Sequence, residues 1–165
     1  METFDYKFTK VNHLSSVSDE EDLLIWVFHV DKTPPHIGIS TQGVFFSMKS
    51  NGQDKIPVDK VSYMVKNKNI KLIKLKLNIR LSVALVEHVF NSFTSATSAR
   101  CSCLSPIKKV LDVPNEIPKL SDLLIYLDGA KKISGWSAQN VSVEEAGIKS
   151  YAVSDIEKRL NFLNA

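Results

Sequence analysis

The first half of the chain alternates short apolar runs with polar turns, which is the pattern of β-strands. Residues 22–30 (DLLIWVFHV) are a continuous apolar run rich in β-branched and aromatic side chains, as expected of a strand buried on both faces. After two prolines, HIGIS (residues 36–40) alternates, TQG turns the chain, and VFFSMK (residues 44–49) returns. The pattern predicts a hairpin beside a central strand.

Two more segments come before the spacing of apolar residues changes from a strand-like to a helical period. Residues 50–60 (SNGQDKIPVDK) are mostly polar and predict a loop followed by a short helix. Residues 70–78 (IKLIKLKLN) predict another strand. Its lysines are expected on a solvated or edge face; they are Lys71, Lys74 and Lys76.

The second half shows helical spacing. Residues 79–93 carry an apolar stripe with a period near 3.6, and residues 101–113 (CSCLSPIKKVLDV) carry a second one, with Pro106 acceptable in the first turn of its helix. Residues 118–129 predict a short helix closed by its final glycine. Residues 133–147 have no clear period and are expected to be irregular.

The last segment, residues 154–163, predicts a terminal helix. Ser154 and Glu157 have the spacing of a capping box. The apolar side chains expected to be buried by this helix are Ile156, Leu160 and Leu163.

Strands followed by helices predict an α+β fold. We expect one domain over residues 1–165, with a mostly antiparallel sheet of five or six strands packed against the helix that carries the cysteines. The length and the 44% hydrophobic content suffice for one sizeable core.

Charge and cysteine content exclude several classes of protein. The net charge of +3 is far from that of a dedicated DNA-binding protein, and no aromatic residues interleave with the lysines of residues 66–76, so no nucleic-acid partner is expected. The N-terminus resembles no signal peptide, and no apolar run reaches membrane-spanning length, so we expect a cytoplasmic protein without a membrane span. Two cysteines in CSC cannot form a disulfide framework.

These cysteines lie at a predicted helix N-terminus, where the helix dipole favours a thiolate. A nucleophilic cysteine also needs a base, usually a histidine oriented by a third polar group. Of the four histidines, His36 has a strand-start position and a polar cross-strand neighbour, Ser47, in a hairpin whose opposite residues lie about 5 Å apart. A triad of cysteine, His36 and Ser47 is therefore the candidate active site.

Metal binding is the alternative use of these residues. Cys101, Cys103 and one histidine supply three ligands, but structural zinc sites use a C-x₂₋₄-C pair with a second pair elsewhere, which this chain lacks. We expect neither a metal nor another cofactor.

The order of these motifs resembles the permuted branch of the NlpC-like, papain-like cysteine hydrolases, which includes relatives of lecithin:retinol acyltransferase. An apolar strand, then HIGI, a tight turn, an aromatic return strand and later SCLSPIKKVL carry the resemblance. As in that branch, the histidine strand precedes the cysteine helix. The resemblance covers a papain-like core of residues 22–127 and leaves residues 128–165 as a C-terminal extension with a terminal helix.

The resemblance implies residue roles. His36 matches the general base, Ser47 the third polar residue, and Cys103 the nucleophile, because the apolar residues four, seven and eight positions after Cys103 match the family's buried face. Cys101 is the reserve nucleophile. The implied reaction is attack of a thiolate on an amide or ester carbonyl, a thioacyl intermediate, and release by water in a hydrolase or by another acceptor in an acyltransferase.

Two departures from the family pattern support an alternative. The third residue is usually histidine, asparagine, glutamine or an acid rather than a serine, and Pro106 replaces an aromatic or aliphatic residue. A catalytically degraded papain-like protein that binds a peptide or acyl group therefore stays open beside the hydrolase, and neither the substrate nor the oligomeric state follows from the sequence.

Overall fold

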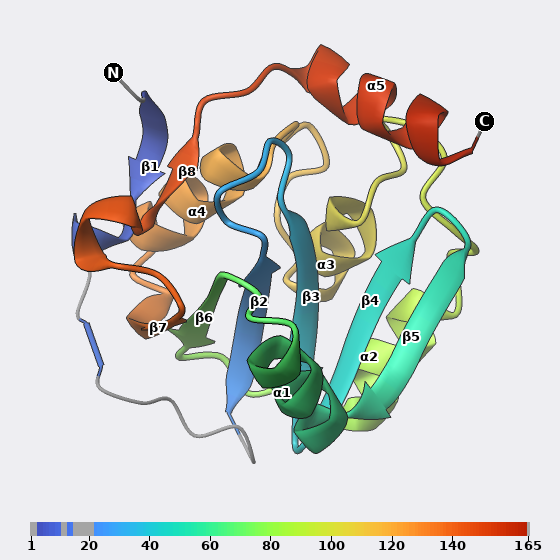
Figure 1. The fold of residues 1–165 in the computed structure, drawn as a ribbon. Helices are drawn as coiled ribbons and strands as arrows, with labels where there is room; N and C mark the ends of the chain where they lie inside the picture. The colour runs from blue at the N-terminus through green and yellow to red at the C-terminus, as the bar shows by residue number, and fades with distance from the viewer. Residues whose placement is uncertain (1–2, 11–12, 15–21, 165) are drawn as a thin grey trace.

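The computed structural model describes residues 3–10, 13–14 and 22–164 and has an α+β fold built on a six-stranded sheet (Figure 1). The strand order is β5-β4-β3-β2-β6-β7, and every neighbouring pair is antiparallel. The strands are β2 (Leu23–Phe28), β3 (His36–Thr41), β4 (Val44–Lys49), β5 (Gly52–Pro57), β6 (Leu72–Leu77) and β7 (Ile133–Gln139). The predicted α+β class and the antiparallel sheet of five or six strands are confirmed.

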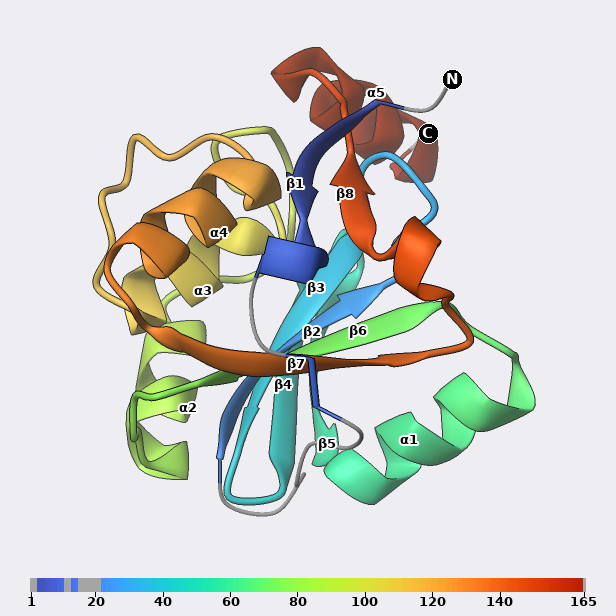
Figure 2. The same ribbon diagram turned by 90° about the vertical axis from the view of Figure 1, so that its left-hand side faces the viewer.

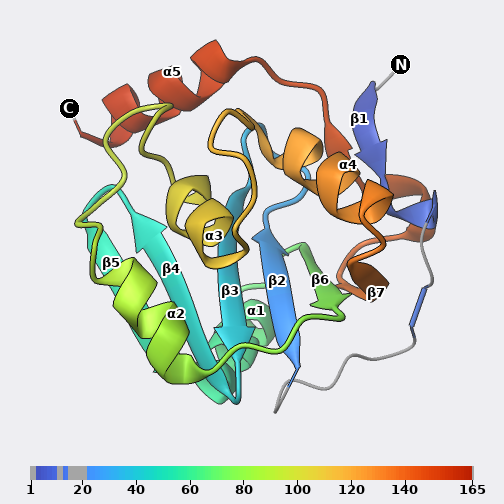
Figure 3. The ribbon, with the colours of Figure 1, turned by 180° about the vertical axis from the view of Figure 1, so that it is seen from behind.

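Helices cover both faces of the sheet. The helices that pack on the sheet are divided between its two faces, as the views from the side and from behind show (Figures 2 and 3). They are α1 (Val58–Asn67) on the first face and α2 (Val83–Phe90), α3 (Leu104–Val110) and α4 (Leu120–Gly129) on the second. The sheet therefore separates a smaller apolar cluster on the α1 side from a larger one on the side of α2, α3 and α4.

The central strand and its hairpin follow the sequence pattern. All six residues of β2 are buried, because their alternate side chains enter the two clusters. Gln42 and Gly43 have φ values of 51° and 79°, so they form the tight turn that joins β3 to β4. The predicted hairpin is confirmed.

The predictions for residues 50–60 and 133–147 are wrong in part, because each range contains an edge strand of the sheet. β5 is half exposed with a polar sequence, and β7 contains Ser134, Gly135 and Ser137, which have low strand propensity. Backbone pairing with β4 and β6 determines their conformation instead.

For the lysines of residues 70–78 the sequence predicts a solvated or an edge face, and the structure contradicts only the edge alternative. β6 lies between β2 and β7, where Lys74 extends over the ring of Trp26 with its ammonium 5.0 Å from the ring centroid. The lysine stems cover apolar surface while the ammonium groups stay near solvent.

The terminal helix α5 (Val153–Leu163) begins one residue before the predicted start. Ser154 is not its N-cap. Instead, Asp155 accepts a hydrogen bond from the Ala152 N–H at 2.7 Å. Ile156 and Leu160 are buried as predicted, but Leu163 is 45% exposed, so its predicted burial is wrong.

Segments from both ends of the chain form a second, two-stranded sheet. β1 (Phe4–Lys7) pairs antiparallel with β8 (Gly147–Lys149) next to α4, and short 3₁₀ turns occupy Phe8–Lys10 and Val143–Glu145 (Figure 1). The segment after α4 thus contributes one strand to each sheet. Within the described residues, no helix is long and apolar enough to cross a bilayer.

Candidate active site

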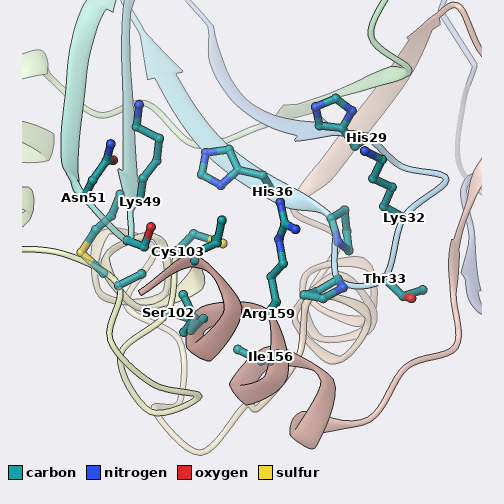
Figure 4. A pocket seen from close by; sticks show the side chains of 17 residues that line it. His29, Lys32, Thr33, His36, Lys49, Asn51, Ser102, Cys103, Ile156 and Arg159 are labelled. Carbon is teal, nitrogen blue, oxygen red and sulfur yellow. The ribbon is translucent and has the colours of Figure 1, made fainter. Parts of the chain in front are cut away.

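A cavity of about 450 Å³ opens at the end of the sheet where β3 begins (Figure 4). Four parts of the fold line it: the β2–β3 loop with the start of β3, the end of β4, the segment that enters α3, and α5. Cys103 and His36, which are 67 positions apart in the sequence, both contribute to its wall. The antiparallel hairpin and the packing of α3 against the sheet bring them there.

Cys103 is the N-cap of α3, as the sequence predicts for the cysteine segment. The preceding serine organises the turn: Ser102 Oγ accepts a hydrogen bond from the Leu104 N–H at 3.2 Å, and Ser105 Oγ accepts one from the Ser102 N–H at 3.0 Å. Leu104 and Ile107 enter the larger cluster and so fix the helix on the sheet. Cys103 also lines a second, adjoining cavity of about 40 Å³.

The thiol of Cys103 does not have the acidity that its helix position predicts. Burial raises its pKa, and hydrogen bonds from the backbone N–H groups of Ile37 and of Cys103 itself offset only part of this effect. The cost of removing the thiolate from water exceeds the stabilisation that the dipole of this short helix supplies. The expected depression of the Cys103 pKa is therefore corrected to an elevation.

His36 is the first residue of β3, and its ring packs against the smaller cluster. The imidazole stacks on Phe28 with ring centroids 5.8 Å apart and an interplanar angle of 28°. Burial, and then the positive charge of Lys49, lower its pKa to about 4, so the imidazole is neutral at pH 7. Among the hydrogen bonds of the described residues, none joins His36 to Cys103.

Ser47 is not paired directly with His36, and it lies on the opposite side of the sheet from α3 and Cys103. The β3–β4 register pairs Ile39 with Phe46 and Thr41 with Val44, so Ser47 aligns with Gly38 rather than with His36. The expected direct pairing of His36 with Ser47 is therefore wrong by two residues.

The Ser47 side chain lies on the face of the sheet opposite α3. Phe46 and Met48 enter the larger cluster, so the side chain between them points to the opposite, α1 side of the sheet, away from α3. Ser47 Oγ is buried and has no hydrogen-bond partner among the described residues.

Cys101, the reserve nucleophile, does not line the cavity in this structure. It is half-buried, and its thiol donates to the Ser95 carbonyl oxygen with Sγ 3.7 Å from that oxygen. Cys103 is therefore the cysteine that shares the cavity with His36.

Sequence reasoning missed the charged residues of the cavity. Lys32, Lys49 and Arg159 all line it, although they come from the β2–β3 loop, the end of β4 and α5. Figure 4 shows Arg159 extending from α5 toward His36. A partial signal was available, because DKTPPH places a lysine in the short loop that leads into the histidine strand.

No cluster of three or more His, Cys, Asp or Glu side chains that could hold a metal ion occurs within the described part of the chain. Comparison of the chain with family models, with curated proteins and with solved structures gave no match. The geometry of the cavity is thus the main guide to function.

Proposed function

We propose that the protein is a cysteine hydrolase of amides or esters, with Cys103 as nucleophile and His36 as general base. The observation that carries the proposal is that these two residues, selected from the sequence, line one solvent-accessible cavity. The proposal includes the papain-like relationship in its permuted order, with the histidine strand before the cysteine helix.

The proposed reaction starts from a neutral thiol and a neutral imidazole. His36 has a free acceptor nitrogen when neutral, so it can take the thiol proton once its ring turns from Phe28 toward the cavity. The sulfur attacks the acyl carbon and forms a thioester as the leaving group takes the proton from the imidazolium. Water, deprotonated by His36, then adds to the thioester. The C–S bond breaks, the carboxylic acid is released, and the sulfur takes the proton from the imidazolium to regenerate the thiol.

The first test is the pH dependence of iodoacetamide alkylation, with mass spectrometry assigning Cys101 and Cys103 separately. Parent protein, His36→Ala and the matched control His88→Ala, whose histidine is exposed on α2, are compared. Because burial raises the pKa of the Cys103 thiol, we expect its alkylation to be slow at pH 7 and to rise with pH in the parent and in His88→Ala, with about a tenfold lower rate in His36→Ala.

An unreactive Cys103, or one whose alkylation rate is unchanged by the loss of His36, contradicts the hydrolase. If Cys101 instead depends on His36, the nucleophile is the reserve cysteine. A reactive Cys103 justifies a screen of p-nitrophenyl esters and peptide amides, with Cys103→Ser as the inactive control.

A second candidate function is ligand binding without catalysis. The burial that raises the pKa of the Cys103 thiol and the location of Ser47 across the sheet favour it. Binding of an acyl compound in the cavity, together with equal binding by Cys103→Ser and no turnover by the parent, distinguishes it from the hydrolase.

A further inference from the structure

The charged side chains that line the cavity all have the same sign. Lys32, Lys49 and Arg159 contribute formal positive charges, and no Asp or Glu among the described residues lines the cavity. Two histidines, His29 and His36, add donors that gain charge on protonation. A net positive cavity attracts anions.

These cations differ in how far the protein already neutralises them. Lys49 Nζ lies 3.0 Å from Asp54 Oδ2, so part of its charge is compensated. Among the described residues, neither Lys32 nor Arg159 has a carboxylate within ion-pair distance. Arg159 instead packs over its helix neighbour Phe162, with the guanidinium carbon 6.0 Å from the ring centroid.

The remainder of the cavity is mainly apolar. Met48, Ala96, Ile156 and Leu160 line it together with Cys103. An acyl chain in contact with these groups places its carbonyl within the same space as the thiol, while Lys32 and Arg159 remain for a polar end. The lining thus has an apolar part and a cationic part.

We propose that the cavity selects an acyl compound that carries an anionic group, with Arg159 and Lys32 as the specificity-determining residues. This inference rests on the proposed function for the acyl part of the ligand. The guanidinium is well suited to this role because its planar set of N–H donors can hold a carboxylate by two parallel hydrogen bonds. Lys32 and Arg159 then gain a counter-charge that the described residues do not supply within ion-pair distance.

The test compares binding of octanoate and of its neutral analogue octanamide by isothermal titration calorimetry. The proteins are the parent, the double variant Lys32→Met/Arg159→Gln, and the control Lys60→Met/Arg80→Gln, whose two exposed cations lie outside the cavity. We expect about tenfold tighter binding of octanoate than of octanamide by the parent and by the control, and no preference in the double variant.

Equal affinity of the parent for both compounds, no octanoate binding at up to about 10 mM, or a preference that survives in the double variant overturns the inference. Cys103 alkylation separates this result from the proposed function. An octanoate preference with an inert thiol retains the anion site and removes the hydrolase, whereas a His36-dependent thiol without the preference retains the hydrolase and removes the anion site.

Discussion

At the scale of single residues, burial acts on the two candidate catalytic groups in opposite directions and leaves both uncharged. It raises the pKa of the Cys103 thiol and lowers that of His36 to about 4. The resting pair is therefore a thiol and an imidazole rather than a thiolate and an imidazolium. An anion bound beside His36 favours its protonated form, so the ligand proposed for the cavity would raise the pKa of this imidazole.

The depressed pKa of His36 makes stability depend on pH. The unfolded chain binds a proton at the ordinary value of 6.5 and the folded chain only near about 4, so acidification between these values favours unfolding. We expect the parent to lose about 2 kcal/mol of unfolding free energy from His36 between pH 7.5 and 5. Urea unfolding at both pH values measures this loss.

The matching variant is His36→Gln, which cannot titrate, with the exposed His88→Gln as control. The loss of unfolding free energy between pH 7.5 and 5 should be smaller by about 2 kcal/mol in His36→Gln and unchanged in His88→Gln. The pKa of His29 is also lowered, mainly by burial, and its contribution is common to all three proteins. Identical pH dependence in the parent and His36→Gln contradicts the burial of the imidazole.

At the scale of elements, α5 is the part of the cavity wall that comes from the C-terminal segment. It contributes Ile156, Arg159 and Leu160 to the lining. Glu157 on the same helix accepts a hydrogen bond from the Ala99 N–H at 2.6 Å, which ties α5 to the segment that enters α3. One hydrogen bond thus links the element carrying Arg159 to the element carrying Cys103.

Replacement of Glu157 by alanine should weaken this link. We expect a loss of about 1–2 kcal/mol of unfolding free energy, because a charge-assisted bond to a backbone donor is removed. Urea denaturation measures the loss, and Glu144→Ala, at an exposed position in the 143–145 turn, is the control. Equal stability of both variants contradicts a structural role for this contact.

The elements that could be predicted are those whose own residues determine their conformation. The apolar run of β2 and the Gln42–Gly43 turn are local signals, and so are the apolar stripes of α2 and α3. β5 and β7 were missed because pairing with β4 and β6, rather than their own polar residues, makes them strands. Conformation imposed by distant partners leaves little local signal.

In the candidate site too, local sequence predicts some features and tertiary packing determines the others. Helix spacing located Cys103 at the start of α3, and the strand pattern located His36 at the start of β3. The hairpin register, the stacking of the imidazole on Phe28 and the burial of the thiol depend on tertiary packing. Arg159 could not be found from spacing, because only the fold brings α5 to the cavity.

At the scale of the whole molecule, the segment after α4 is part of both sheets. β7 pairs with β6 along the main sheet and buries Trp136, which is 1% exposed, while β8 pairs with β1. The segment is thus built into the structure on which the cavity depends.

A truncation after Gly129 tests this integration. Loss of β7, β8 and α5 leaves β6 without a partner on one side and removes a wall of the cavity. We expect the cooperative thermal transition seen by circular dichroism in the full chain to disappear. A truncated chain that melts cooperatively at the same temperature shows that the last segment is dispensable.

The edge strands of the main sheet, β5 and β7, affect whether copies of this protein associate. An unprotected sheet edge recruits strands from neighbouring molecules. On β5, half-buried and exposed residues alternate, and Lys55 forms an ion pair with Glu87 of α2 beside that margin. On β7, the Leu14 N–H donates to the Trp136 carbonyl oxygen at 2.7 Å, and the His13 ring packs on the same tryptophan. The charged side chains beside β5 and residues 13–14 beside β7 disfavour strand pairing between copies of the protein. Edge-to-edge aggregation is therefore not expected to block the open cavity.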